Sequence, residues 1–324
     1  MLGRRQFLRG AGAAAAAAAL AGCSRDTWWQ DASGRLRIAT GNVGAVFDEY
    51  GAALRTEATQ VLPGVRSEVV VTGGSVGNVL DLSSGTADVA FCLGDTALDA
   101  VRGEGAFDSP VPLTALARLY DSFLQILVPV DSPVTGIQDL TGVRLSAGQT
   151  DSGTRSVTER CLAAAGVDTA DVDFVAQPLG EATAALSTGR VDALAFVSGF
   201  PVRALVELGA RTPVRALDLG GLVEGIVSTW GPQYVTGPLP AGPYRLPAAV
   251  QTVSVKTYLI ATPTLREDTA YGFTSVVFDR QDAIARTVPD VRQPTVAAGM
   301  FTQPVPLHPG ALRWFRDRDA REVR

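Results

Sequence analysis

Hydrophobic and polar positions follow two periods from about residue 35 onward. Leu36 and Ile38 alternate with arginines, as in a half-buried strand, whereas apolar residues recur every three or four positions from Val46 to Val61, as in an amphipathic helix. The first predicted series is a strand around 36–38, a helix over 46–61, a strand over 65–71, a short helix over 75–82 and a strand over 88–93. Ser75 is expected to cap the short helix.

A second series repeats the first. Its predicted elements are strands over 143–147, 172–176 and 191–197 and helices that open at 152–154 and at 180. At matching junctions, Gly85 and Gly189 lie 104 positions apart, as do Asp88 and Asp192. Coincidence is the alternative, because Gly after a helix and Asp before a strand are common. Strands that alternate with helices imply parallel pairing, so we expect an α/β fold with two lobes of similar build.

Two later segments are expected to cross between the lobes. They are the apolar run from Phe123 to Val130 and the strand-like run from Gln251 to Ala261. This assigns residues 35–125 and 251–324 to the first lobe and 126–250 to the second. In the returning part, apolar positions from Ala270 to Ile284 predict one long helix. The charged end, from Arg316 to Arg324, is expected to be frayed.

The first 22 residues indicate export rather than fold. Arg4 and Arg5 begin a twin-arginine pattern, and an Ala/Gly run follows that is too short to span a bilayer. The sequence from Leu20 to Cys23 resembles a lipobox, in which the Cys23 thiol takes the lipid. Residues 23–34 would then be a tether, with Trp28-Trp29 at the membrane interface or simply within that tether. The alternative is an alanine-rich helix next to a structural cysteine.

Composition narrows the chemistry. The 324-residue chain is 46% hydrophobic and 19% charged, with a formal net charge of −5, which excludes a disordered chain and argues against nucleic acid as a partner. The single histidine, His308, excludes a multi-histidine metal site, and no metal or cofactor is expected. Cys92 and Cys161 lie in apolar runs and are interpreted as small core residues, with a disulfide between them left open.

Three glycine-rich loops follow predicted strands and open helices. They are Gly41–Gly44, Gly73–Ser75 and Thr150–Thr154. Ligands of α/β proteins gather at the carboxyl ends of strands, and helix N-termini present unpaired N–H groups and partial positive charge. Loops of this kind on two facing lobes predict a cleft for an anion such as a carboxylate. Ordinary capped turns are the alternative.

Several short motifs stand out along the chain. They are Gly73-Gly74-Ser75-Val76 with Asn78, Ala87–Phe91 with Asp95, Gly103–Phe107, Ser152-Gly153-Thr154, Pro240–Tyr244 and Pro306–Ala311. Together they resemble the TAXI family of TRAP-associated solute receptors over about residues 35–316. The resemblance implies a two-lobed periplasmic-binding-protein-like fold of type II, with the two crossing strands as its hinge.

The expected ligand contacts combine the loops with this resemblance. They are Asn42, Val43, Phe47, Gly74, Ser75, Asp95, Thr150, Ser152, Gly153, Thr154, Gly199 and Phe200. The serine and threonine hydroxyls would hold carboxylate oxygens, Asp95 would accept from a ligand amine or hydroxyl or orient other groups, and the two phenylalanines would pack on the apolar part of the ligand.

Two departures from the family pattern concern these loops. The first loop keeps one aromatic residue and adds Asp48 and Glu49, which either face the cleft mouth or simply occupy the first turn of a helix in solvent. Phe200 stands where a smaller residue is usual. Both changes argue against transferring the usual dicarboxylate or amino-acid ligands to this chain.

The function expected from these features is that of an exported lipoprotein that captures a small carboxylate-bearing solute. Closure of the lobes would bury the solute, and the closed form would dock on a TRAP-type membrane permease. One alternative is a sensor that presents its closed form to a signalling partner. Another is a hydrolase with a serine nucleophile and His308 as base, although no Gly-x-Ser-x-Gly elbow is present.

Overall fold

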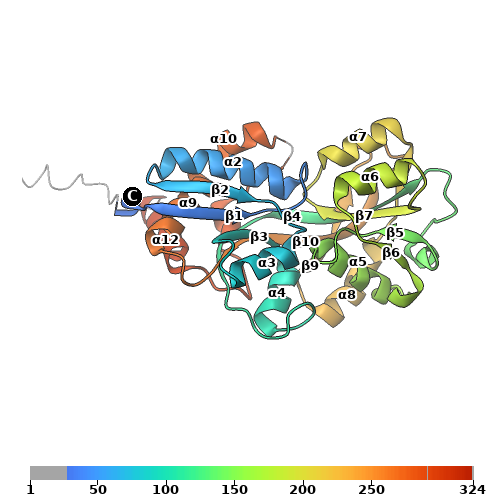
Figure 1. Ribbon diagram of the computed structural model, residues 1–324, viewed down its shortest axis with the longest axis horizontal. Helices are drawn as coiled ribbons and strands as arrows, with labels where there is room; N and C mark the ends of the chain where they lie inside the picture. The colour runs from blue at the N-terminus through green and yellow to red at the C-terminus, as the bar shows by residue number, and fades with distance from the viewer. Residues whose placement is uncertain (1–27, 290, 323–324) are drawn as a thin grey trace, which may run out of the picture.

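The computed structural model describes residues 28–289 and 291–322, and its strands join into one mixed ten-stranded sheet (Figure 1). The strands are β1 (Gly34–Ala39), β2 (Val65–Val70), β3 (Val89–Leu93), β4 (Thr114–Pro129), β5 (Arg144–Ser146), β6 (Asp173–Val175), β7 (Ala193–Ser198), β8 (Val214–Ala216), β9 (Tyr234–Leu239) and β10 (Val250–Ala261). Their order is β2-β1-β3-β10-β4-β7-β5-β6, with β8 on β4 and β9 on β10. The predicted signal peptide and Cys23 lie outside the described residues.

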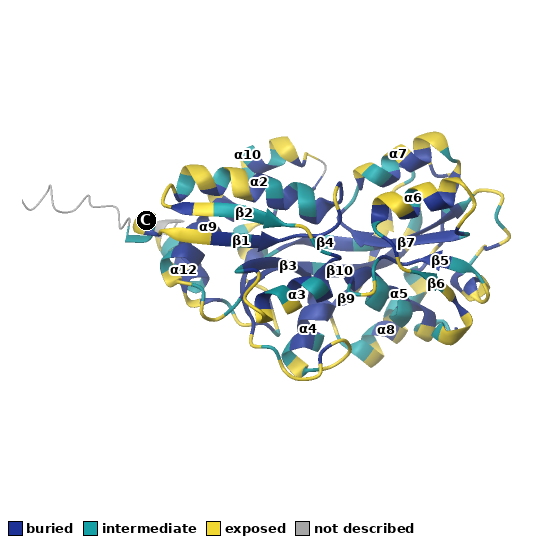
Figure 2. Cartoon of the chain, in the orientation of Figure 1, coloured by how far each residue is buried: buried dark blue, intermediate teal, exposed yellow. Residues whose placement is uncertain are grey.

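The helices cover the sheet from both sides. They are α2 (Val46–Val61), α3 (Ser75–Ser83), α4 (Gly94–Arg102), α5 (Gly153–Ala164), α6 (Leu179–Ser187), α7 (Arg203–Arg211), α8 (Val223–Trp230), α9 (Glu267–Asp279), α10 (Gln281–Thr287), α11 (Val296–Gly299) and α12 (Pro309–Glu322). Every residue of β3 and β7 is buried, as expected for parallel strands covered on both faces (Figure 2). Within the described ranges, no helix combines the length and apolar character needed to cross a bilayer.

The sheet divides into two lobes of the same plan. In the first lobe, β2, β1 and β3 are parallel, and antiparallel β10 lies beside β3. In the second, β6, β5 and β7 are parallel, and antiparallel β4 lies beside β7. We call β1–β3 with α2–α4 and α9–α12 the first lobe, and β5–β8 with α5–α8 the second lobe. The expected α/β fold with two crossing strands is confirmed.

The crossing strands pair with both lobes along their length. β4 pairs with β10 from Thr114 to Phe123 and with β7 from Phe123 to Leu127. β10 pairs with β9 over its first half and with β3 over its second half. β4 begins well before the predicted crossing run, because its first half completes the sheet of the first lobe. The lobes are therefore joined by continuous backbone hydrogen bonding, which permits bending at the middle of two strands.

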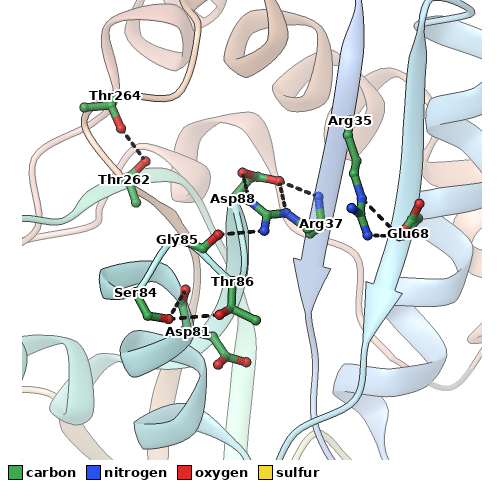
Figure 3. Close-up of polar contacts among 10 residues, drawn as sticks. All are labelled: Arg35, Arg37, Glu68, Asp81, Ser84, Gly85, Thr86, Asp88, Thr262 and Thr264. Carbon is green, nitrogen blue, oxygen red and sulfur yellow. Dashed lines mark hydrogen bonds and ion pairs between the residues drawn. The ribbon is translucent and has the colours of Figure 1, made fainter.

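The internal repeat extends to a specific ion pair. In the first lobe, the Arg37 guanidinium donates to both carboxylate oxygens of Asp88 and to the carbonyl of Gly85, and the Arg37 N–H also donates to Asp88 (Figure 3). In the second lobe, Arg144 makes the same four contacts with Asp192 and Gly189. Each glycine has a φ near +70°, which turns its carbonyl toward the arginine after a helix end. The two junctions that match in sequence thus also carry the same ion pair and the same hydrogen bonds.

The C-terminal part differs from its prediction. The long helix expected from Ala270 to Ile284 is broken at Arg280, which separates α9 from α10. The prediction that the chain frays from Arg316 onward is wrong as far as Glu322, because α12 continues to that residue. Trp314 in α12 stacks on Phe278 of α9, and burial of these rings holds the helix in place.

The tryptophan pair also belongs to the folded part. Residues Trp28–Asp31 form a short 3₁₀ helix, and the Trp28 and Trp29 rings lie 5.3 and 5.6 Å from the ring of Tyr271 in α9. These rings therefore pack on the folded first lobe, rather than lying in a loose tether. Part of their apolar surface is covered by protein, which is the more favourable environment for it.

Asp192 provides a test of the repeated ion pair. Hydrogen bonding from Arg144 holds the pKa of Asp192 below its ordinary value of 3.8, so the pair stabilises the fold above that value and loses its effect as pH falls through the lowered pKa. Because both side chains are about 40% exposed, we expect Asp192→Asn to lower the free energy of unfolding by about 1 kcal/mol at pH 7. Urea unfolding across acidic and neutral pH measures this difference.

The control is Asp108→Asn, which changes an exposed carboxylate with no ion pair among the described residues. A difference between wild type and Asp192→Asn that does not shrink in acid would contradict the assignment.

Candidate functional site

Two helices from opposite lobes begin at the same place. α3 starts at Ser75 in the first lobe, and α5 starts at Gly153 in the second. The Cβ that an alanine would carry at Gly153 would lie 3.0 Å from Ser75 Oγ, so the two first turns are in contact. The N–H groups of Ser75, Val76, Gly153 and Thr154 find no acceptor among the described residues. Both partial positive ends therefore point their unpaired donors into one region.

Each first turn is fixed to a strand end by a hydroxyl. Leu93 N–H at the end of β3 donates to Ser75 Oγ at 3.1 Å, and Val197 N–H near the end of β7 donates to Thr154 Oγ1 at the same distance. The expected capping role of Ser75 is wrong: Gly74 is the N-cap, and the Ser75 side chain serves the strand instead. Each hydroxyl still carries a hydrogen that a ligand oxygen can accept.

A small cavity of about 30 Å³ lies where these turns meet. Of the expected ligand contacts, Asn42, Phe47, Gly74, Ser75, Ser152, Gly153 and Thr154 line it. Sequence reasoning missed the strand-end residues Leu93, Phe196, Val197 and Ser198, which also line it. No lining residue is charged. The cavity therefore offers neutral hydrogen-bond donors to a group about the size of two water molecules.

Hydrogen bonds across the lobe junction surround the cavity. The Leu179 N–H at the start of α6 donates to Asn42 Oδ1 at 2.9 Å, and the Gly77 N–H of α3 donates to the Asp151 carbonyl at 3.0 Å. On the outer side, Arg203 of α7 pairs with Glu49 of α2 at 2.9 Å. These contacts join residues of both lobes, so the structure is in a closed arrangement.

Aromatic rings form one wall of the site. Phe47 stacks on Phe91 with ring centroids 5.2 Å apart, and Tyr50 contacts both Phe91 and Tyr120. The Tyr50 hydroxyl donates to Gln293 Oε1 at 2.8 Å. Phe47 lines the small cavity, whereas Tyr120 at the other end of this row lines a second, larger crevice, so the packed rings lie between the two.

Five expected contact residues lie elsewhere. Val43 is 68% exposed, and Thr150 faces an open groove beside α5. Gly199 and Phe200 line a separate crevice of about 520 Å³, where Phe200 contacts Tyr244. Asp95 is fully buried and bonds to Arg160 and Tyr234 rather than lining the cavity.

The two acidic residues that follow Phe47 do not line the cavity. Asp48 accepts from the Gly44 N–H at 3.1 Å, and Glu49 makes the ion pair with Arg203. Their charges therefore serve the first turn of α2 and the lobe junction, so they do not oppose an anion inside the cavity.

His308 lacks the freedom that a catalytic base needs. Its Nδ1 accepts from the Gly310 N–H at 3.1 Å, which leaves Nε2 to carry the proton and donate to the Leu265 carbonyl at 2.9 Å. Burial lowers the pKa of His308 below its ordinary value of 6.5, so the ring is neutral at pH 7. The hydrolase interpretation thus loses its base.

The remaining polar candidates fit a core role. Cys92 and Cys161 are buried free thiols, and burial raises the pKa of both. Within the part of the chain that the structure describes, no cluster of three or more His, Cys, Asp or Glu could hold a metal ion.

Comparison with known families places this fold and site. The model of the NMT1-like family matches residues 38–318, which include both lobes and every cavity-lining residue. The chain belongs to the NMT1-like family. The match begins in β1 and ends in α12, so the family signature and the two-lobed unit coincide.

Solved structures show the same fold for this NMT1-like chain. A binding-protein component of an ABC phosphonate transporter from Pseudomonas aeruginosa has a TM-score of 0.55 at 10% identity and covers 90% of this chain and 100% of its own. PhnD1 from Prochlorococcus marinus, in complex with methylphosphonate, has a TM-score of 0.51 at 14% identity, covering 81% and 92%. XAC2383 from Xanthomonas citri, bound to ATP, has 0.52 at 13%, covering 88% and 99%. The shared architecture is that of periplasmic binding proteins.

Gly153 tests whether close approach of the lobes depends on a missing side chain. In Gly153→Ala the new Cβ would lie 2.7 Å from Leu93 Cδ1 across the junction. We expect this variant to fold but to hold the lobes apart, with a larger radius of gyration in small-angle X-ray scattering.

The matched control is Gly180→Ala in the first turn of α6, where a Cβ meets nothing within 4 Å. Equal scattering profiles for Gly153→Ala and wild type would show that the junction is looser than described.

Proposed function

We propose that this protein is an extracytoplasmic solute receptor that captures a small carboxylate-bearing anion between its lobes. The observation that carries the proposal is the meeting of two helix N-termini from opposite lobes at a small, partly open cavity. Among the described residues, four N–H groups at these termini have no acceptor, and no charged side chain lines the cavity. An anion oxygen satisfies such donors and gains from both helix dipoles.

The donors lie on opposite lobes, which couples binding to closure. A ligand that contacts only the α3 turn or only the α5 turn satisfies half of them, whereas a ligand held between the lobes satisfies both sets. The anion therefore favours the closed arrangement through its differential affinity for the two states. Hinge closure around a ligand is the motion that the two crossing strands permit.

The solved structures of similar fold support an anionic solute. The Pseudomonas aeruginosa protein is a component of a phosphonate transporter, and PhnD1 was solved in complex with methylphosphonate. The cavity of about 30 Å³ fits a compact oxygen-bearing group, so the solute is expected to be small or to leave its remainder toward the cleft mouth.

The partner is proposed to be a membrane permease that receives the solute from the closed receptor. The motifs shared with TAXI receptors, such as Gly74-Ser75 and Ser152-Gly153-Thr154, favour a TRAP-type permease. The Pseudomonas aeruginosa neighbour belongs to an ABC transporter, so a permease of that class is the competing partner. Co-purification of the closed receptor with each permease class distinguishes them.

Thr154 tests the binding site. Thr154→Val keeps the shape of the side chain but removes the hydroxyl, and loss of a hydrogen bond to a charged ligand costs about 1.5–3 kcal/mol. We expect acetate to bind the wild-type protein in calorimetric titration and the variant to bind it roughly ten- to a hundredfold more weakly.

Thr154→Ser is the matched control, because it retains the hydroxyl and is expected to bind acetate like wild type. The same titration with methanesulfonate and methylphosphonate compares other oxyanions. Acetate affinity that is unchanged in Thr154→Val would remove Thr154 from the site.

Membrane attachment is proposed to occur through a lipid on Cys23. We expect the wild-type chain to take up labelled palmitate and to sediment with membranes, and Cys23→Ser to lose both properties while keeping acetate binding. Cys92→Ser, which alters a buried thiol, is the control. Membrane sedimentation that persists in Cys23→Ser would contradict lipid anchoring at this residue.

A further inference from the structure

A buried cluster of charges joins the lobes beside the cavity. Arg160 on α5 of the second lobe lies between Asp95 and Asp99 on α4 of the first lobe. Its Nη1 is 3.4 Å from Asp95 Oδ2, and its Nη2 pairs with Asp99 Oδ2. The side chain of Arg160 is 12% exposed, that of Asp99 13% and that of Asp95 0%. The Asp95 carboxylate is therefore shielded from solvent, whereas Arg160 and Asp99 are mostly buried and also line the open groove beside α5.

A tyrosine completes the cluster. Arg160 Nη1 donates to the Tyr234 hydroxyl at 2.7 Å, and that hydroxyl donates to Asp95 Oδ2 at 2.7 Å. The other oxygen of Asp95 accepts from the Thr96 N–H. Burial alone would disfavour the guanidinium charge, but Asp95, Tyr234 and Asp99 outweigh it and raise the pKa of Arg160. The group is charged and bonded, not stranded.

The cluster is mechanically linked to the cavity on both sides. Arg160 lies six residues after Thr154, which is about 9 Å along the axis of α5 from the turn that lines the cavity. α4 follows directly after Leu93, whose side chain lines the cavity and whose N–H bonds to Ser75. The contacts between Arg160 and α4 therefore affect the positions of the first turns of both α3 and α5, which carry the unpaired N–H groups.

We propose that Arg160 is a positioning residue for the solute site, holding the first turn of α5 against that of α3 through Asp95 and Asp99. The proposal rests on the proposed function of the cavity. When the lobes part, water can replace the lost partners, so the contribution of the ion pairs to closure is their attraction less the cost of desolvating the charges. Hydrogen bonds from Tyr234 and from the Thr96 N–H to Asp95 favour a positive balance. On this proposal the protein supplies part of the free energy that closure needs, and the ligand supplies the rest.

The test compares Arg160→Met with Arg37→Met. Arg37→Met breaks an arginine–aspartate pair that lies wholly within the first lobe, so it reports a loss of stability without a change at the junction. We expect ligand-free Arg160→Met to show a larger radius of gyration in small-angle scattering than wild type, and Arg37→Met to match wild type.

Acetate binding provides the second readout. If the closed arrangement is less populated, the apparent Kd rises by the same factor, and we expect about tenfold or more in Arg160→Met. The increase should come from faster dissociation, measured by stopped-flow dilution of the acetate complex with the intrinsic fluorescence of the four tryptophans as the signal. Arg160→Lys keeps the charge and should recover part of the wild-type affinity.

The outcomes separate the two proposals. Wild-type scattering and wild-type acetate dissociation in Arg160→Met would overturn the role of Arg160. If wild type binds no small oxyanion, the proposed function fails, yet ligand-free scattering still decides whether Arg160 holds the lobes together. If Arg160→Met does not fold, Tyr234→Phe, which removes only the bridging hydroxyl, is measured in the same way: a larger ligand-free radius supports the proposal, and an unchanged radius overturns it.

Discussion

The unpaired N–H groups at the starts of α3 and α5 determine how the rest of this molecule can behave. Donors that are buried without a partner cost about 1–3 kcal/mol each, so bringing the lobes together over an empty cavity is unfavourable at that point. The closed arrangement must therefore be stabilised elsewhere or by a guest. The ion cluster around Arg160, the Arg203–Glu49 pair and the Asn42 contact lie around the cavity and oppose that cost.

The lobes repeat one another in plan but not in how they approach a ligand. Both fix a first turn to a strand end through a hydroxyl, and both anchor a far corner with an arginine–aspartate pair. In the first lobe, however, the N-cap of α3 is Gly74, whose φ of 134° suits only glycine and which presents bare backbone. In the second lobe the N-cap of α5 is Ser152, whose hydroxyl accepts from the Arg155 N–H. The two first turns thus occupy equivalent positions in their lobes, but they differ in the residue that caps the helix.

The sequence allowed the order of elements and the loops at the cavity to be predicted, because both depend on local period and glycine placement. It left open whether Asp95 would contact a ligand or orient other groups, and in the structure Asp95 bonds to Arg160 and Tyr234. It did not single out Arg160. Arg160 lies in the middle of a helix with no motif around it, and its partners are distant in sequence, because Asp95 and Asp99 belong to α4 and Tyr234 to β9. Gly199 and Phe200 were expected at the cavity from the resemblance to the TAXI family, but after Ser198 the chain enters a separate crevice, which these two residues line.

The packing of Trp28 and Trp29 on Tyr271 has a consequence for orientation. Trp28 lies only five residues after Cys23 in the sequence, and five residues span no more than about 18 Å. A lipid at Cys23 would therefore keep the α9 end of the first lobe close to the bilayer. The second lobe, attached through β4 and β10, would then be the lobe that moves during opening and closure. A permease would bind a receptor whose orientation at the membrane is already restricted.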